Sequence, residues 1–236
     1  MSHSLVFRPP TSLLGEGDAS ALNIQAVLTD VCQGLAPLID QKRLREDLLT
    51  TLPDNATSAQ FWQALLLAAR AQIEIEPAYT FVAARALLLA LYQEVQPSWQ
   101  PIGLTDASVL YQQYFPLYFQ RGVEVGLLDP RLLDFDLSQL AQAIHPERDL
   151  LFAYPGLQTL YDRYFLQAGE QRIELPQLFW MRVAMGVALG EVHKEASALA
   201  FYECISQFLF TPATPTLFNA GTCHPQLSSC YVTVVE

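Results

Sequence analysis

The stretch IELPQLFWMRVAMGVAL, residues Ile173 to Leu189, is the apolar run that decides the fold class of this sequence. Pro176 is suited to the first turn of a helix, because its missing N–H would have no partner there. Phe179, Val183 and Val187 then recur at steps of four, so they share one helical face. The stretch therefore predicts an apolar helix that runs from Pro176 to Leu189.

Helical spacing also accounts for most of the chain upstream and just downstream of this run. Helices are predicted over about 21–35, 43–52, 57–73, 77–95, 111–125, 136–145, 157–165 and 195–209. Thr57 with Gln60 predicts a capping box, and Asp136 predicts an N-cap. Pro116 is expected to end or kink the helix that contains it. Residues 167–171 are predicted to form a turn between two short extended pieces.

The pattern changes after residue 210. Residues 211–216 read TPATPT, in which two prolines and β-branched neighbours are expected to exclude a helix. Residues 227–235 end in the run CYVTVV, whose β-branched side chains show little alternation and predict a strand buried on both faces. The chain is therefore predicted to be a mostly helical body that leads into a sheet. Because one strand needs several neighbours, the protein is expected to be truncated or divided at Glu236.

Composition and charge exclude several classes of protein. Hydrophobic residues make up 51% of the 236 positions and charged residues 16%, which favours a packed core over disorder. Thirteen basic against twenty-four acidic residues give a net charge of −11, which disfavours broad binding to nucleic acid or to a membrane surface. Arg85 and Arg182 interrupt the two most apolar windows, which are too short to span a bilayer. The N-terminus has no signal peptide, so a cytoplasmic protein is expected.

The stretch TPTLFNAGTCHPQLSSC, Thr214 to Cys230, carries the candidate chemistry. Hydroxyls and free backbone N–H groups at a junction between a strand and a loop can bind phosphate oxygens. A structural loop with a core cysteine is the more frequent interpretation of such a stretch. Cys223, His224 and Cys230 fit no zinc-binding spacing, so no metal site is expected. Cys32 and Cys204 are expected in the core, and four scattered cysteines make no disulfide framework. Aromatic residues at helical spacing are predicted to be core or interface: Tyr111, Tyr114, Phe115, Tyr118 and Phe119.

The order of these motifs resembles the large (catalytic) subunit of ribonucleotide reductase. TPTLFNAGT and PQLSSC resemble the segment that builds the first strands of that family's catalytic barrel. HPERDLLFAYPGLQTLYDRYF (145–165), IELPQLFWMRVAMGVAL and AYTFVAARA (78–86) are similar to the helical region before it. The resemblance covers roughly 74–236. It implies a mainly α N-terminal region that leads into the first strands of a ribonucleotide-reductase-type α/β barrel, truncated at Glu236.

The resemblance also implies a division into three regions. Residues 1–96 form a helical N-terminal region, which could be a degenerate ATP-cone, and 97–210 form a helical domain before the barrel. Residues 211–236 form the first loop and strand of the catalytic barrel. The segment LVFRPP, residues 5–10, lacks the lysine and the glycine turn that introduce an ATP-cone, which puts ATP/dATP control of overall activity in doubt.

Carried over by position, Cys230 matches one of the two active-site cysteines that form a disulfide as the nucleotide is reduced. Two thiols supply the two electrons that removal of the 2′-hydroxyl requires. Thr214 and Ser229 match positions that hold the ribonucleotide near its phosphates. The implied enzyme is a ribonucleoside-diphosphate reductase that makes deoxyribonucleotides for DNA synthesis. The second redox cysteine and the radical-bearing cysteine lie further along in that family, so this chain alone is expected to be inactive.

Several partners follow from the same resemblance. They are the remainder of the large subunit, a radical-generating dimetal small subunit, a ribonucleoside diphosphate substrate, a thioredoxin- or glutaredoxin-type reductant, ATP/dNTP effectors and a second copy of the complete subunit. No cofactor or metal is expected on this chain itself, and no nucleic acid or membrane. Two alternatives stay open: a fragment of a cobalamin-dependent ribonucleotide reductase, and a non-catalytic helical fragment that acts in assembly.

Overall fold

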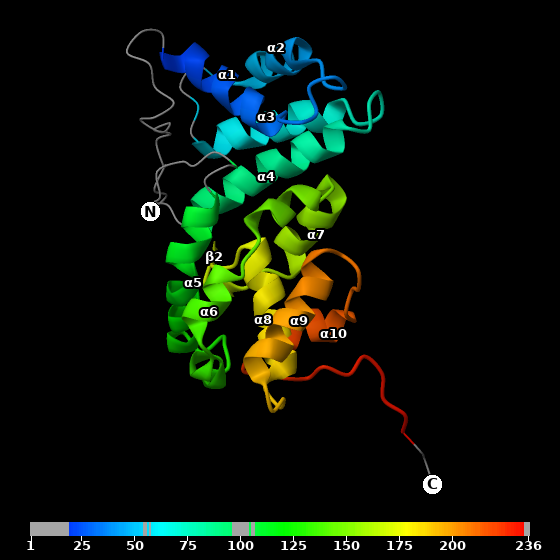
Figure 1. Cartoon of the computed structure of the whole chain (residues 1–236). Coiled ribbons are helices and arrows are strands. Elements are labelled where there is room, and N and C mark those ends of the chain that lie inside the picture. Colours follow the sequence, from blue (N-terminus) through cyan, green and yellow to red (C-terminus); the bar gives the residue numbers. More distant parts are fainter. Residues whose placement is uncertain (1–18, 54–55, 57, 96–103, 105–106, 234–236) are drawn as a thin grey trace. The chain divides into compact units, whose positions relative to one another are not determined.

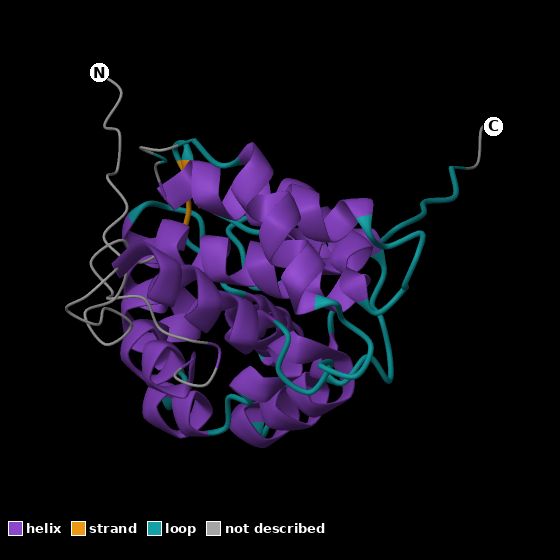
Figure 2. Cartoon of the chain, turned by 90° about the horizontal axis from the view of Figure 1, so that it is seen from above, coloured by secondary structure: helices purple, strands orange, loops and turns teal. Residues whose placement is uncertain are grey.

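The computed structural model of the chain describes residues 19–53, 56, 58–95, 104 and 107–233 (Figure 1). Almost all regular structure in these residues is helical, and the strands form one short pair (Figure 2). The chain divides into two compact units. The N-terminal unit comprises Met1–Ala107 and Leu150–Tyr161, and the C-terminal unit comprises Ser108–Asp149 and Asp162–Glu236.

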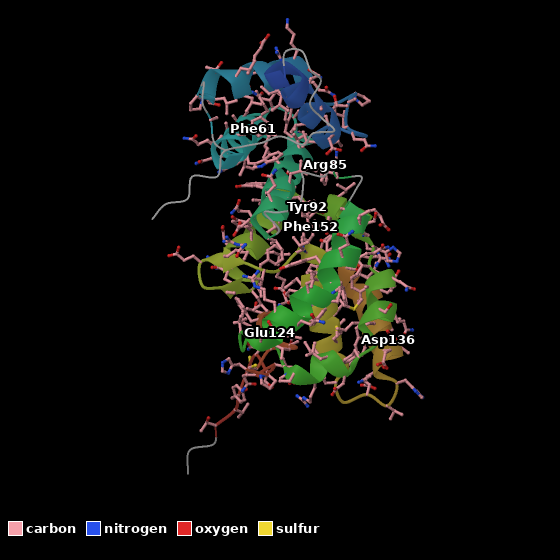
Figure 3. All side chains as sticks on the ribbon, turned by 90° about the vertical axis from the view of Figure 1, so that its left-hand side faces the viewer. Phe61, Arg85, Tyr92, Glu124, Asp136 and Phe152 are labelled. Carbon is pink, nitrogen blue, oxygen red and sulfur yellow. The ribbon has the colours of Figure 1, made fainter. Side chains whose placement is uncertain are left out.

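The N-terminal unit is built from helices that share an apolar core. They are α1 (Ala19–Val31), α2 (Gln41–Thr51), α3 (Ser58–Ala71), α4 (Tyr79–Val95) and most of α7 (Tyr154–Arg163). Helix α4 packs against α1 and α3. It buries 11 of its 17 residues, mainly alanine and leucine, so neighbours cover more than one of its faces. Phe61, Tyr92 and Phe152, labelled in Figure 3, are buried aromatic residues of this unit.

The C-terminal unit is arranged around the apolar run at 173–189. Its elements are α5 (Ala107–Glu124), the 3₁₀ helices η3 (Pro130–Asp134) and η4 (Pro146–Leu151), α6 (Leu137–Gln142), β1 (Gln167–Ala168), β2 (Gln171–Arg172), α8 (Pro176–Ala188), α9 (Lys194–Ser206) and α10 (Thr214–Asn219). Helix α8 packs against α9 and α10. Nearly all of its residues are buried, including the polar Gln177 and Arg182, so neighbours cover more than one of its faces.

The structure confirms most of the predicted helices. Pro176 is the first residue of α8, and the Asp136 side chain caps α6 by accepting a hydrogen bond from the Gln139 N–H at 2.9 Å. The turn at 167–171 is an antiparallel hairpin. The aromatic cluster of α5 is core, as predicted. Thr57, in the predicted capping box, lies outside the described residues. None of the described helices has both the length and the apolar character needed to cross a bilayer.

Three local predictions are wrong. The helix does not end at Pro116, because α5 continues through it to Glu124, with buried aromatic residues on both sides of the proline. Helix α10 begins inside TPATPT, because Pro215 lies in the first turn, where a missing N–H leaves no bond unmade. Residues 227–233 form no strand, and Tyr231 and Val232 are exposed. A β-branched run gives a strand only when another strand pairs with its backbone, and the described residues offer none beside it.

Candidate functional site

The three residues proposed from the sequence belong to the C-terminal unit, and all are exposed. Thr214 is the first residue of α10. Ser229 and Cys230 belong to the irregular segment that follows this helix. Because the predicted strand is absent, the Cys230 thiol is accessible to solvent and is not buried at the head of a strand.

Two hydrogen bonds hold the segment after α10 against that helix. The Asn219 side chain donates to the Gln226 carbonyl at 2.6 Å, and the Thr216 hydroxyl donates to the Leu227 carbonyl at 3.4 Å. As the segment advances from 226 to 227, its contact on α10 moves back from 219 to 216. These contacts hold residues 226 and 227 beside α10, and Ser229 follows two residues after the last contact. No hydrogen bond between described residues joins Thr214 to Ser229 or Cys230.

Tyr164 is a neighbour of this site that no motif in the sequence indicated. Its hydroxyl lies 3.3 Å from the Thr214 Oγ1 atom. Its ring stacks on Phe218 with 4.4 Å between centroids and 10° between planes, and it meets Phe179 edge-on. The stack links α10 to the chain just before the hairpin, so it helps to fix the position of Thr214.

A fully buried ion pair lies behind α10. The Glu174 carboxylate accepts a hydrogen bond from Arg182 Nε at 2.7 Å, and both side chains have no exposed surface. It also accepts from the Tyr118 hydroxyl at 2.5 Å and from the Leu166 N–H at 3.0 Å. Removing two charges from water is costly unless their remaining donors and acceptors are bonded. Here α5, α8 and the hairpin region together supply those bonds.

The other guanidinium nitrogens of Arg182 reach the end of α10. Nη1 donates to the Ala220 carbonyl at 2.7 Å, and Nη2 donates to the Leu217 carbonyl at 3.3 Å. Burial by itself would lower the pKa of Arg182, but Glu174 and Tyr118 together outweigh it and the pKa is raised. Burial and the same carboxylate raise the pKa of Tyr118 well above 10.0. Arg182 thus stays charged and Tyr118 stays a hydrogen-bond donor.

Two glycines allow the chain after α10 to lie directly on α8. A Cβ atom on Gly186 would lie 2.0 Å from the Gly221 nitrogen, so only glycine fits at that point of α8. Gly221 itself has a φ of +73°, and a Cβ there would lie 2.8 Å from the Arg182 carbonyl oxygen. Gly221 therefore needs both the left-handed conformation and the missing side chain.

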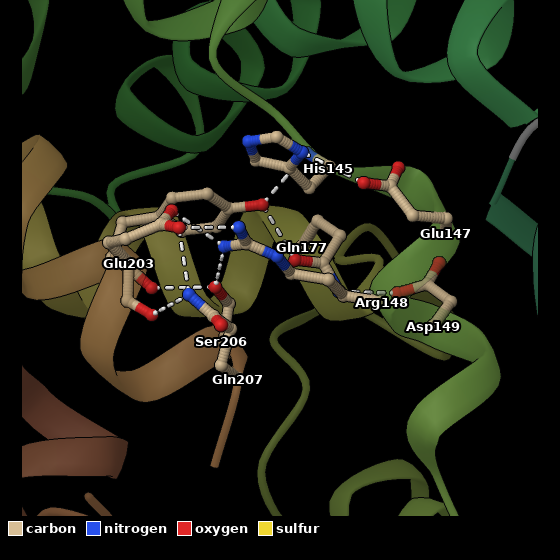
Figure 4. A network of polar contacts seen from close by, with 9 residues as sticks. His145, Glu147, Arg148, Asp149, Gln177, Glu203, Ser206 and Gln207 are labelled. Carbon is tan, nitrogen blue, oxygen red and sulfur yellow. Dashed lines mark hydrogen bonds and ion pairs between the residues drawn. The ribbon is translucent and has the colours of Figure 1, made fainter. Parts of the chain in front are cut away.

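A second polar network joins η4, α8 and α9 (Figure 4). Arg148 makes two hydrogen bonds to the Glu203 carboxylate, at 2.8 and 2.7 Å, and these lower the pKa of Glu203. The Arg148 guanidinium lies over the Tyr202 ring. The Tyr202 hydroxyl donates to Gln177, whose amide donates to the buried Asp149, both at 2.7 Å. The Arg148–Glu203 pair fixes η4 to α9 and lies outside the contacts of α10.

The cysteines differ in environment. Cys32 is buried, as predicted, and burial raises its pKa to about 11. Cys204 was expected in the core but is exposed, because α9 turns Tyr202 and Ile205 inward instead. The exposed Cys223 donates its S–H to the Leu128 carbonyl at 3.1 Å. Across the described ranges, no three or more His, Cys, Asp or Glu side chains are grouped so that they could hold a metal ion.

Comparison with known proteins gives consistent matches. A family model described as "Ribonucleotide reductase, all-alpha domain" matches residues 150–225. The ribonucleoside-diphosphate reductase subunit alpha of Chlamydia muridarum is 42% identical over 212 residues, which is 89% of this chain and 20% of that protein. The subunit alpha of Helicobacter pylori is 40% identical over 82% of this chain and 24% of its own length. The large subunit of Danio rerio is 29% identical over 90% of this chain and 26% of its own length.

These matches cover most of this chain, but the chain spans only about a fifth to a quarter of the length of these relatives. The matched all-alpha domain agrees with the helical structure of residues 150–225. The resemblance found in the sequence is confirmed.

Proposed function

We propose that this chain, which corresponds to the N-terminal portion of a ribonucleotide reductase large subunit, contributes a redox thiol and a substrate grip to the reduction of ribonucleoside diphosphates. One observation carries the proposal. A chain 42% identical to a ribonucleoside-diphosphate reductase subunit has an exposed thiol, Cys230, on a segment tethered to the helix that begins with Thr214. Thr214, Ser229 and Cys230 are exposed, so a ligand can reach their side chains.

The proposed reaction replaces the 2′-hydroxyl of the ribose with hydrogen and releases water. Two electrons are needed, and two thiols supply them when they form a disulfide. Cys230 is one of these thiols and delivers hydrogen towards the 2′ carbon. Thr214 and Ser229 hold the nucleotide near its phosphates, because the reacting atoms must be held to within about 1 Å for efficient transfer.

The remaining parts of the reaction belong to other segments or partners in this proposal. The second redox cysteine and the radical-bearing cysteine lie in the remainder of the large subunit. The radical comes from a dimetal small subunit, and a thioredoxin- or glutaredoxin-type protein restores the thiols. A homodimer of the complete subunit, ATP/dNTP effectors and a cytoplasmic location belong to the same proposal.

We also propose that the C-terminal residues enter the first strands of the catalytic α/β barrel. The exposed side chains of Phe210, Tyr231 and Val232 support this, because large apolar residues in such number are suited to burial against further chain. We propose three regions. Residues 1–96 are a helical region, for which a degenerate ATP-cone is one interpretation. Residues 97–210 are a helical domain, and residues 211–236 enter the barrel.

Turnover of a Cys230→Ser variant tests the redox role. In the large subunit that contains this chain, assayed with its small subunit and a thioredoxin-type reductant, the variant is expected to lose turnover by at least about 10³-fold. Substrate binding should stay within about threefold, because serine keeps the shape of the side chain. Turnover at the wild-type rate would contradict the proposal.

A further inference from the structure

Helix α8 presents two features to the end of α10, and they lie one turn apart. Arg182 bonds the Leu217 and Ala220 carbonyls, and Gly186 allows the Gly221 backbone to touch the helix. Residues four apart share one face of a helix, so Arg182 and Gly186 form a single seat. Helix α10 and the turn after it rest on this seat.

The charged part of the seat is held in one orientation. Glu174 bonds the Nε and Nη2 atoms of Arg182, whose Nη2 and Nη1 atoms also reach the α10 carbonyls. Tyr118 and the Leu166 N–H in turn fix Glu174. The guanidinium is planar with donors in a fixed fork, so fixing one edge determines where the other donors point. The contacts that α5 and the hairpin region make with Glu174 therefore determine how the Arg182 guanidinium meets α10.

Stability alone does not account for an ion pair at this position. Apolar side chains of similar volume often replace a buried ion pair with no loss of stability. What they cannot replace is directed hydrogen bonding to two named carbonyls. Helix α10 has only six residues, and its own hydrogen bonds are too few to fix its position.

We propose that Arg182, oriented by Glu174 and Tyr118, is a positioning residue for substrate binding: it sets the place of α10, and through it the place of Thr214 and of the segment that carries Ser229 and Cys230. This inference rests on the proposed function, since it assumes that Thr214 contacts the substrate. Arg182 is fully buried and bonds the end of α10, so in this proposal it acts through α10.

The test is the substrate KM of an Arg182→Lys variant of the large subunit that contains this chain. Lysine keeps the charge but has one nitrogen, so it cannot bond Glu174 and both carbonyls together. We expect KM for the ribonucleoside diphosphate to rise about tenfold, because a shift of the grip by a fraction of an ångström weakens every contact it makes. The control is Arg148→Lys, which weakens the ion pair between Arg148 and Glu203 in the same unit. It should lower Tm less, because Glu203 is half exposed, and it should leave KM within about twofold.

Two results would overturn the inference. One is a KM for Arg182→Lys within twofold of wild type, and the other is an equal rise in KM for Arg148→Lys. If Arg182→Lys does not fold, Tyr118→Phe decides the question, since it removes one bond to Glu174 and keeps the ion pair. It should raise KM about threefold, and an unchanged KM would refute the role.

Further measurements separate this inference from the proposed function. If Thr214→Val raises KM while Arg182→Lys does not, only the inference fails.

If the wild-type assembly reduces no nucleotide, the proposed function fails, and amide exchange in the chain itself still tests the seat. The N–H of Ala220, which bonds the Thr216 carbonyl, should exchange at least about tenfold faster in Arg182→Lys, with α9 unchanged. Equal exchange would refute the seat.

Discussion

The two units of the chain differ in what their cores are made of. Among the described residues, Gln72 is the buried polar residue of the N-terminal unit, whereas the C-terminal unit buries seven: Asp129, Asp149, Glu174, Gln177, Arg182, Ser206 and Thr222. Apolar packing has no preferred direction, so many arrangements of similar volume satisfy it. Buried hydrogen bonds have defined directions and partners, and they specify one arrangement. The unit that carries Thr214, Ser229 and Cys230 is the one whose core is directional.

The largest expected effect comes from breaking the buried ion pair. Glu174→Leu leaves the Arg182 charge without its partner in the core, and it should lower the free energy of unfolding by about 3–5 kcal/mol. The double variant Glu174→Leu with Arg182→Met should recover most of this loss, because no charge is then buried. Urea unfolding measures both. A free energy of unfolding for Glu174→Leu within about 1 kcal/mol of wild type would contradict the difference between the two cores.

The same comparison predicts tolerance in the N-terminal unit. Leu65 is fully buried there among apolar neighbours. Leu65→Met nearly conserves volume and should lower the free energy of unfolding by less than about 1.5 kcal/mol in the same urea experiment. A loss as large as that of Glu174→Leu would show that the apolar core is no more tolerant than the polar one.

An effect smaller than that of Glu174→Leu is expected where the end of α10 touches α8. Gly186→Ala places a methyl group against the Gly221 backbone and should lower stability by about 1–3 kcal/mol. Gly190 is the matched control, because a Cβ there would meet nothing within 4 Å. Gly190→Ala should change the melting temperature little. Equal melting temperatures for the two variants would contradict the close contact.

The smallest perturbation is a label that changes no packing before it reacts. At pH 8 the Cys32 thiol, with a pKa of about 11 against an ordinary 9.0, has about 100-fold less thiolate than an unburied cysteine. Iodoacetamide should therefore modify Cys230 and Cys204 well before Cys32, as followed by peptide mass spectrometry. Unfolding in urea should abolish the difference. Early labelling of Cys32 in the folded chain would contradict its burial.

The sequence predicted features that depend on local chemistry. The Asp136 cap, the Pro176 helix start and the 167–171 turn each follow from a few neighbouring residues. It failed where a distant contact decides the result. Arg182 appears in the sequence only as a charge that interrupts an apolar run, and nothing nearby indicates that Glu174, Tyr118 and the α10 carbonyls surround it. A lone arginine inside an otherwise apolar helix is the pattern that could have indicated a buried ion pair.

The errors near the candidate site have the same physical origin. The prolines of TPATPT predict no helix, but Pro215 lies in the first turn of α10, where it is tolerated, and Arg182 donates to the Leu217 and Ala220 carbonyls. The β-branched residues of the run at 230–235 predict a strand, but backbone pairing decides strand formation. The resemblance assigned roles to Thr214, Ser229 and Cys230, and these roles stay predictions.

Single-turnover trapping of Cys230 tests the central claim most directly. The large subunit that contains this chain, with its small subunit, is given a ribonucleoside diphosphate without external reductant, and free thiols are then alkylated. We predict that Cys230 is recovered in a disulfide in proportion to the deoxynucleotide formed, because two thiols supply the two electrons. Product formed while Cys230 remains fully alkylated would contradict the account.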